Sequence, residues 1–460
     1  MWEQVHGLSK TTPRHAAWRL LQAVWREASY ANIAWPKILR ESGLSEPDRR
    51  YATELAYGTL RHTDTLLEIL RDASGKNPKS WQPEVSWVLQ LGCYQLLYMR
   101  TASHAAVNET VSLARQVGLS RATGLVNAVL RKVSAKPLDG WLVALCHASG
   151  VERECLALSY AHPSWVVAEL QQSLAREGRE AEIEALLSAH NAPARVTAAL
   201  LPGLASLGTD EGPTPYSPLG VYLSGDPGDD ERVRSARARI QDEGSQLAAL
   251  VAAQGVAMRP GERILDACSG PGGKTAVLAS LAQQVGARVT ALEIAPHRAE
   301  LVKQAVSALS ESGTCDVQVG DATQLTGEFD RILLDAPCSG LGALRRRPEA
   351  RWVKKKSDLE DLHLLQQQLL DACLGALAPG GVLTYVTCSP VVSETTGAIT
   401  SALQRHPDVR ALDTAALLDQ VARDPVSDAA VGTAVQMWPH RHGTDAMFIQ
   451  VLQKQAPSSN

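Results

Sequence analysis

The chain has 460 residues, enough for two to four domains, and its 45% hydrophobic and 20% charged residues are typical of a globular protein. Its formal net charge at pH 7 is only −4. It holds no run of about eighteen apolar residues, which excludes a membrane-spanning helix. It starts without a basic segment followed by an apolar one, so we expect neither a signal peptide nor a membrane partner.

The charge is unevenly distributed along the chain. Residues 1–134 hold 17 Lys and Arg against 11 Asp and Glu, a formal charge of +6, so the remainder carries −10. A basic first part on an acidic whole suggests a polyanionic partner, although a solvated helical surface would give the same counts.

The cysteine pattern argues against a zinc or redox site. None of the eight cysteines forms a Cys-x-x-Cys pair, and we expect no metal. They lie at positions 93, 146, 155, 268, 315, 338, 373 and 388. We expect a reducing cytoplasm, in which the thiols stay free for packing or chemistry.

Residues 13–134 are predicted to be helical throughout. Residues 17–24 place apolar side chains at the spacing of one helical face. Ser45, followed by Pro47, marks a helix start. Because no alternating apolar pattern competes, we predict an all-α bundle within a first domain of residues 1–140.

The middle of the chain, residues 141–235, is predicted to be a small α+β adaptor. Helical patterns over residues 152–190 are followed by an apolar run at 195–201 that fits a strand. Residues 202–230 are rich in Gly, Pro, Asp and Ser, which indicates loops or a linker.

From residue 236 strand and helix patterns alternate, and the predicted third domain covers residues 236–455. The expected strands are 263–267, 287–293, 316–320, 330–335 and 381–387, and the expected helices are 274–284, 296–310, 358–377 and 393–404. This βαβ order predicts a mainly parallel, Rossmann-like sheet with helices on both faces. Apolar runs at 434–438 and 446–452 predict a terminal antiparallel hairpin, an ending that resembles that of class I methyltransferases.

A strand, a glycine-rich turn and a helix open this domain, with the sequence DACSGPGGKT at 266–275. Glycine has no Cβ, so the backbone can approach a ligand closely. The spacing of Gly270, Gly272 and Gly273 does not fit the dinucleotide fingerprint, and Cys268 stands where a P-loop needs glycine. The turn therefore favours a smaller ligand such as S-adenosylmethionine, and a turn needed only for packing is the alternative.

Acidic side chains end four successive predicted strands, and they are Asp266, Glu293, Asp321 and Asp335. Ligands of an open α/β sheet bind at the carboxyl ends of its strands. Glu293 lies about twenty residues beyond the glycine turn, the distance of a carboxylate that holds ribose hydroxyls. Each carboxylate alone could be a helix N-cap, but four at successive strand ends favour a ligand site.

Two cysteines follow predicted strands that are adjacent in a doubly wound sheet. Cys338 stands in Asp-Ala-Pro-Cys-Ser-Gly and Cys388 in Tyr-Val-Thr-Cys-Ser-Pro. Most cysteines are small buried hydrophobic residues. These two lie beside Pro or Ser at strand exits and would face one cleft, where a thiolate could act as a nucleophile.

Three motifs resemble those of the RNA cytosine-5 methyltransferases, namely DACSGPGGKT, DAPCSGLGALRRRPEARW and TYVTCSP. The chain is most similar to the RsmB (Sun/Fmu) type, which modifies 16S ribosomal RNA. The segment QDEGSQLAAL precedes the methyltransferase core in that type, and residues 13–134 resemble its NusB-like RNA-binding domain. The resemblance covers nearly the whole chain. After Cys388 many members have Pro-Glu-Glu-Asn, whereas this chain has Ser-Pro-Val-Val-Ser-Glu-Thr, which leaves the role of Glu394 open.

The resemblance implies a covalent mechanism, in which a thiolate attacks C6 of cytosine and thereby makes C5 nucleophilic. Cys388 resembles the attacking cysteine, and Cys338 resembles the one that assists release. Asp335 would hydrogen-bond or protonate the ring at N3. Lys274 would orient the cleft or stabilise the thiolate.

The resemblance also implies S-adenosyl-L-methionine as the cofactor. Its binding residues by motif are Cys268, Ser269, Gly270, Pro271, Gly272, Gly273 and Lys274 along the turn, Glu293 at the ribose, Asp321 near the adenine and Asp335 near the methionine end.

The implied partner is RNA, with 16S ribosomal RNA favoured. The base must leave any duplex to be reached, so a loop or an exposed helix end is the expected target. Residues 345–356 hold seven basic residues and one acidic residue around Trp352, which predicts a phosphate-binding and stacking surface, or else a solvated loop. The alternatives are a transfer RNA or 23S ribosomal RNA substrate, and an inactive RNA-binding assembly factor.

Overall fold

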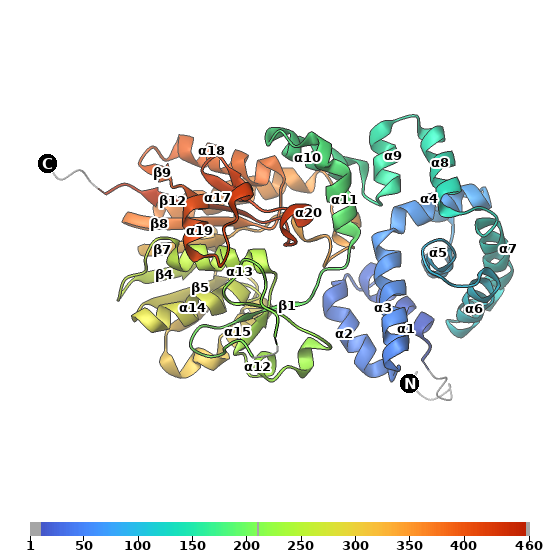
Figure 1. Cartoon of the computed structure of the whole chain (residues 1–460), viewed down its shortest axis with the longest axis horizontal. Helices are drawn as coiled ribbons and strands as arrows, with labels where there is room; N and C mark the ends of the chain where they lie inside the picture. Colours follow the sequence, from blue (N-terminus) through green and yellow to red (C-terminus); the bar gives the residue numbers. More distant parts are fainter. Residues whose placement is uncertain (1–10, 209–210, 457–460) are drawn as a thin grey trace. The chain divides into compact units, whose positions relative to one another are not determined.

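A computed structural model of the chain describes residues 11–208 and 211–456 (Figure 1). It divides into two compact units. The helical unit comprises Met1–Ala168 and Arg346–Val353, and the sheet unit comprises Glu169–Arg345 and Lys354–Asn460. The expectation that the chain starts without a signal peptide concerns residues outside the described ranges.

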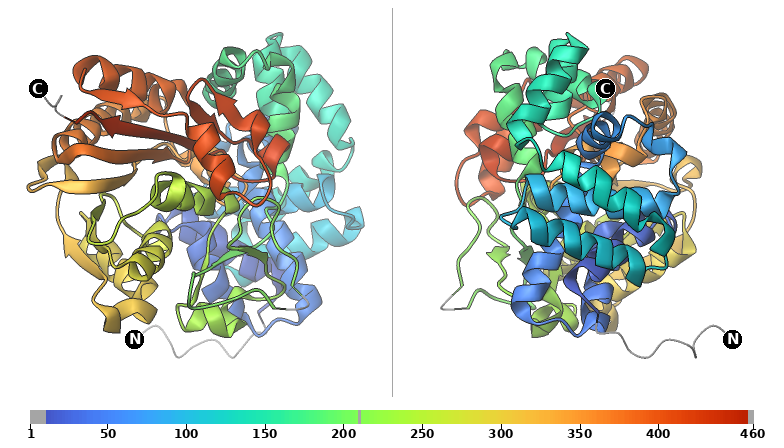
Figure 2. Two further views of the ribbon diagram at one scale, coloured as in Figure 1. Left: turned by 60° about the vertical axis from the view of Figure 1, so that its left-hand side comes forward. Right: turned by 90° about the vertical axis from the view of Figure 1, so that its right-hand side faces the viewer.

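The helical unit confirms the predicted all-α bundle, since its described part contains no strand (Figures 1 and 2). Its helices are α1 (Pro13–Trp25), α2 (Ala31–Ser42), α3 (Glu46–Arg61), α4 (Thr63–Ser74), α5 (Pro83–Leu97), α6 (Ser103–Gln116), α7 (Thr123–Val133), α8 (Leu138–Ser149), α9 (Glu152–Ser159) and α16 (Ala350–Val353), with short turns η1 (Pro78–Ser80) and η2 (Ser120–Ala122). Ser45 caps α3 by accepting from the Asp48 N–H, as the sequence predicts. On α1 the predicted apolar face is buried, with Leu20 and Leu21 at 0% exposure.

Two residues of the basic segment bond to backbone carbonyls of the helical unit, and Arg351 is buried while Trp352 is half-buried. Arg351 Nη1 donates to Ala161 O at 2.8 Å, and the Trp352 indole donates to Leu60 O at 2.7 Å. Arg351 is 0% exposed. The predicted phosphate-binding surface is therefore wrong at Arg351, and stacking by Trp352 stays a prediction. Their partners lie 190 and 292 positions away in the chain, so local composition could not reveal this packing.

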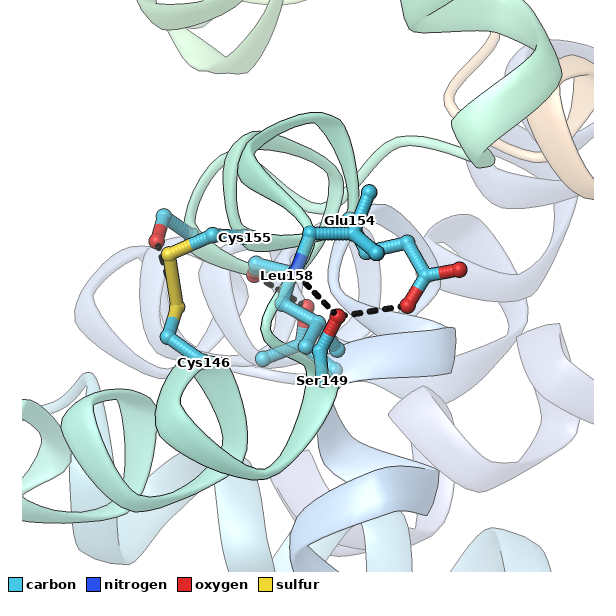
Figure 3. The surroundings of a disulfide bond; sticks show 8 residues. Cys146, Ser149, Glu154, Cys155 and Leu158 are labelled. Atoms are coloured by element: carbon cyan, nitrogen blue, oxygen red, sulfur yellow. Dashed lines mark hydrogen bonds between the residues drawn. A yellow bond between two sulfur atoms is a disulfide. The ribbon is translucent and has the colours of Figure 1, made fainter.

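A disulfide between Cys146 and Cys155 joins α8 to α9 (Figure 3). The expectation that all thiols stay free is therefore wrong for this pair. The two helices form a hairpin that turns at Gly150, whose φ of +64° suits glycine, and the hairpin brings the two cysteines together. The search for Cys-x-x-Cys pairs missed them because they are nine positions apart. The other six cysteines are not in disulfides.

The predicted adaptor contains helices and two strands, β1 and β2, of a small antiparallel sheet of order β2-β1-β3, whose third strand lies just beyond residue 235 in the described chain. The strands are β1 (Thr197–Leu200), β2 (Gly220–Tyr222) and β3 (Ala238–Ile240), and the helices and turns are α10 (Ser164–Arg176), η3 (Glu180–Glu182), α11 (Ile183–Asn191), η4 (Pro227–Asp229) and α12 (Glu231–Arg234). The strand expected at 195–201 is thus confirmed. The boundaries near residues 140 and 235 stay predictions.

The large sheet has the strand order β10-β11-β12-β8-β7-β4-β5-β6, with β9 beside β12. Its strands are β4 (Arg263–Asp266), β5 (Arg288–Glu293), β6 (Cys315–Val319), β7 (Phe329–Asp335), β8 (Leu377–Thr387), β9 (Val409–Ala411), β10 (Ala430–Val431), β11 (Ala434–Gln436) and β12 (Phe448–Lys454). Strands β4 to β8 pair in parallel, and β11 and β12 form the predicted terminal antiparallel hairpin. The mainly parallel α/β fold is confirmed.

Helices cover both faces of this sheet (Figures 1 and 2). The helices and turns of this part are α13 (Glu243–Leu250), η5 (Val251–Gly255), α14 (Gly273–Val285), α15 (Pro296–Ala305), η6 (Ser307–Ser312), η7 (Ala322–Gln324), η8 (Leu341–Ala343), α17 (Asp358–Gly375), η9 (Val392–Glu394), α18 (Thr396–Arg405), α19 (Thr414–Val421), η10 (Ser427–Ala429) and α20 (Pro439–His442). Along β7, Leu333 packs with α13, α14 and α19, while Ile332 and Leu334 pack with α17 and α18. Burial of both faces explains why the strands read as continuous apolar runs. In the described part of the chain, we find no helix long and apolar enough to cross a membrane.

Candidate active site

Three neighbouring parallel strands bring most of the predicted site residues to one edge of the sheet. Strand β7 lies between β4 and β8. Asp266 ends β4, Asp335 ends β7, and Cys388 directly follows β8. Cys338 follows β7 in the next loop, and its Sγ lies 3.4 Å from Sγ of Cys388. The two thiols are thus in direct contact, and that they face a cleft stays a prediction.

The glycine turn is shaped by close packing against its neighbours. Gly272 has a φ of +101° and caps α14, and a Cβ there would lie 2.5 Å from Cβ of Ala305 on α15. A Cβ on Gly270 would lie 2.3 Å from Glu293 Oε2. Gly272 therefore requires glycine for packing alone, and a side chain at Gly270 would displace the Glu293 carboxylate. The packing alternative contributes whether or not a ligand binds.

Lys274 and Asp335 form an ion pair at the end of β7. Lys274 Nζ lies 2.7 Å from Asp335 Oδ2, and the two side chains are 11% and 28% exposed. Burial lowers the pKa of Lys274, but its interactions with Asp335, and then the charge of Cys388, outweigh burial and raise that pKa above its usual value. A permanent cation therefore lies near Cys388, which favours a thiolate there.

Asp266 is a buried carboxyl group that the sequence placed at a strand end without assigning it a role. Its Oδ2 accepts from the Thr275 hydroxyl at 2.7 Å. Its Oδ1 is buried without a well-formed hydrogen bond from the described residues, and the Cys268 N–H acts on the carboxylate more weakly than the Thr275 hydroxyl does. Burial raises the pKa of Asp266 to about 7. An unpaired acceptor at this depth is costly, and a cationic or N–H donor of a ligand would satisfy it.

Glu293 reaches the glycine turn, as its position in the sequence predicts. Its Oε2 accepts from the Gly270 N–H at 3.0 Å and its Oε1 from the Ala295 N–H at 3.0 Å. Arg298 pairs with the same carboxylate and donates to Gly270 O at 2.6 Å. Glu293 is 2% exposed. Through its bond to the Gly270 N–H, it holds the backbone of the glycine turn in place.

Asp321 and two apolar neighbours lie at the ends of β5 and β6. Asp321 Oδ1 accepts a hydrogen bond from the Thr323 N–H at 2.9 Å, so Asp321 is the N-cap of η7. An N-cap is the alternative role that the sequence allows for each of these carboxylates. Ile294 and Val319 are 64% and 56% exposed. These exposed aliphatic side chains could cover the faces of a planar ring, and the sequence analysis missed them because they read as strand residues.

The third cysteine of the predicted site, Cys268, has a different environment from the thiol pair. It packs against the core beneath β4, and burial raises the pKa of its thiol well above the usual value. It therefore suits packing at the turn better than nucleophilic chemistry.

Arg345 serves the sheet unit itself. Its side chain is 9% exposed, donates to Gly443 O at 2.8 Å and pairs with Asp445 at 3.5 Å and Asp242 at 3.9 Å. The predicted basic surface is wrong here too. Lys355 and Lys356 of the same segment are exposed.

The described residues contain no cluster of three or more His, Cys, Asp or Glu that could hold a metal ion. The groups that the described site offers for chemistry are the thiol pair, the Lys274–Asp335 pair and the carboxylates at the strand ends.

The chain is similar to proteins whose names identify them as methyltransferases. The profile of the family described as "16S rRNA methyltransferase RsmB/F" matches residues 253–453, and the profile of the NusB family matches residues 11–135. A Mycobacterium tuberculosis protein whose name says methyltransferase and states no substrate is 42% identical to this chain. The alignment covers 96% of each of the two chains. Ribosomal RNA small subunit methyltransferase B of Pseudomonas putida is 35% identical over 88% of this chain and 91% of its own.

Solved structures agree with the fold. A crystal structure published as that of PH0851 has a TM-score of 0.79 at 19% identity and covers 98% of this chain and 100% of its own. Sequence and fold together show that the chain belongs to the RsmB/F family of S-adenosylmethionine-dependent methyltransferases and carries that family's NusB domain at its start.

Proposed function

We propose that this protein transfers a methyl group from S-adenosylmethionine to carbon 5 of a cytosine in 16S ribosomal RNA, through a covalent bond between Cys388 and C6. The observation that carries the proposal is the 3.4 Å contact of the Cys338 and Cys388 sulfurs at the ends of adjacent strands. Ribosomal RNA as the substrate is supported by the names of the relatives and by the +6 formal charge of residues 1–134. We propose the cytoplasm as the location of the protein, because its proposed substrate, ribosomal RNA, is found there.

The site residues fit the cofactor. The unpaired Asp266 Oδ1 suits the ammonium group of its methionine part, and Glu293 at the turn suits the ribose hydroxyls. Asp321, Ile294 and Val319 suit the adenine. The remaining binding residues by motif are Cys268, Ser269, Gly270, Pro271, Gly272, Gly273, Lys274 and Asp335. S-adenosylmethionine, when bound, supplies an electrophilic methyl group on a positively charged sulfur.

The chain's own residues then divide the work on the base. The Cys388 thiolate adds to C6, and the electrons of the C5–C6 double bond move to C5, where the methyl group is accepted. The Lys274–Asp335 pair shares a proton with N3, which favours that addition. A base takes the C5 proton and passes it to water, with Cys338 assisting this step. The electrons of the C5–H bond restore the C5–C6 double bond, the bond between Sγ and C6 breaks, and the thiolate of Cys388 is restored.

The proposed function also assigns a role to each of the three predicted domains. Residues 1–140 form the RNA-binding domain, residues 141–235 the adaptor, and residues 236–455 the methyltransferase domain. The target base must be flipped or unpaired, because attack at C6 and methylation at C5 need access to the base.

The direct test is an assay with purified protein, S-adenosylmethionine and unmodified 16S ribosomal RNA, followed by mass spectrometry of the nucleosides. We expect 5-methylcytidine to appear in 16S RNA and not in 23S or transfer RNA. Another methylated nucleoside as the product, or preferential modification of transfer RNA, would reject the proposal.

The proposed ribose contact gives a second prediction. We expect Glu293→Ala to lower the affinity for S-adenosylmethionine by roughly 1–3 kcal/mol, because a charged acceptor is lost and the turn loses its bond at Gly270. Isothermal calorimetry measures this, with Glu300→Ala on α15 as the control, since that side chain is 61% exposed. Wild-type affinity in Glu293→Ala would reject the assignment.

A further inference from the structure

A single buried carboxylate holds the loops of both thiols. Glu394 ends η9 and is 0% exposed. Its Oε1 accepts from the Ser339 N–H at 2.7 Å, and its Oε2 accepts from the hydroxyls of Ser339 and Ser389, each at 2.6 Å. Ser339 directly follows Cys338, and Ser389 directly follows Cys388. Glu394 thus bonds to the residue next to each sulfur.

The surroundings of Glu394 fix its position. The Tyr385 hydroxyl donates to Glu394 O at 2.9 Å. Gln366 of α17 donates to Pro337 O at 2.8 Å and lies 3.4 Å from Glu394 Oε1. The hydroxyls of Ser339 and Ser389 are themselves 3.1 Å apart. The network therefore spans β8, α17, η9 and both cysteine loops, so that a shift of one loop would break bonds of the other.

The partners that hydrogen-bond to this carboxylate are neutral groups. Burying a carboxylate costs several kcal/mol unless short hydrogen bonds replace its water, and three such bonds do so here. A neutral residue could link the two loops at a lower cost of burial. The link alone therefore does not account for a charged residue at this position.

Charges of opposite sign act on the two thiols, Glu394 on Cys338 and Lys274 with Cys388. The Cys338 pKa is raised first by its hydrogen bond with Cys388, then by burial and by the charges of Cys388 and Glu394. Lys274 is the cation that interacts with Cys388. Other titratable groups that interact with these residues include Asp266 at the end of β4, Asp335 at the end of β7 and Tyr385 on β8.

We propose that Glu394 is a positioning residue that ties the two thiol loops together and keeps their shared proton on Cys338, so that Cys388 is the thiolate. The assignment of chemical roles to the two thiols rests on the proposed function. The arrangement gives the nucleophile its charge and leaves the neighbouring sulfur as a hydrogen-bond donor. It also answers what the acidic residue after Cys388 does in this chain.

The test needs no RNA, so its failure is distinguishable from a failure of the proposed function. Glu394→Gln has the same shape and can bond to the same serines but carries no charge, whereas Glu394→Ala removes both the tether and the charge. Each variant of the full chain is labelled with iodoacetamide across pH 6–10, and mass spectrometry gives the rate at each cysteine. Glu360→Gln, an exposed carboxylate of α17, is the matched control.

We expect the wild type and the control to label Cys388 faster than Cys338 at neutral pH. In Glu394→Gln the ratio of the two rates should fall about tenfold, with the melting temperature and S-adenosylmethionine affinity close to the wild type. Glu394→Ala should lose the labelling preference for Cys388 altogether, because both the tether and the charge are gone. A wild-type labelling ratio and pH profile in Glu394→Gln would overturn the proposal, even if Glu394→Ala fails to fold.

Discussion

Cys388→Ala is expected to abolish both methyl transfer and the covalent complex with RNA. Without the thiolate no bond to C6 forms, so turnover should fall by roughly 10⁴-fold or more, as removal of a nucleophile does in other enzymes. Cys338→Ala should behave differently, because it can still attack and methylate once. Its adduct should persist, since proton removal and release are slowed while attack is not.

Denaturing gels of each variant with RNA and S-adenosylmethionine distinguish the two roles. A shifted band is expected for Cys338→Ala and none for Cys388→Ala or the double variant. The control is Cys373→Ala, a buried cysteine of α17 outside the site, which should form no persistent band. The reversed pattern would show that the roles are exchanged, and full activity of both single variants would contradict the cysteine mechanism.

Gly342→Ala is expected to inactivate the protein through the backbone of the Cys388 loop. A Cβ on Gly342 would lie 2.2 Å from Ala446 O and 2.8 Å from Cys388 O, and backbone atoms cannot move aside cheaply. The Gly342 N–H also donates to Cys388 O at 3.0 Å. The added methyl group should cost about 1–3 kcal/mol in unfolding free energy and displace the nucleophile.

Urea unfolding and single-turnover methylation measure these two effects. Gly375→Ala at the end of α17 is the matched control, because a Cβ there meets no atom within 4 Å. That variant should be as stable as the wild type or more so by about 0.5–1 kcal/mol. If Gly342→Ala unfolds and methylates like the wild type, the close approach described here has no energetic consequence.

Much of the site could be predicted because it lies where strands end. Asp335 and Cys388 each follow an apolar run that is buried on both faces, and such runs are visible in the sequence. Parallel strands in βαβ order then place these ends on one edge. The glycine turn was recognisable because it follows one of these strand ends, although Gly272 is required by its contact with α15.

What could not be predicted depends on contacts between distant segments. Trp352 reads as an exposed stacking residue, yet its indole bonds to Leu60, 292 positions away. Arg345 reads as a phosphate ligand, yet it pairs with Asp445. Glu394 carries no local pattern that marks it as the partner of Ser339, 55 positions earlier. Periodicity and spacing report local structure, and these three roles arise only from the packed chain.

Bisulfite sequencing of ribosomal RNA tests the central claim most directly. A strain that lacks the gene is complemented with the wild-type protein, with Cys388→Ala or with the empty vector. We expect one cytosine of 16S RNA to resist conversion only with the wild-type protein, because that position alone then carries the 5-methyl group. Identical conversion of every 16S cytosine in all three strains, or a protected position that persists with Cys388→Ala, would contradict the account.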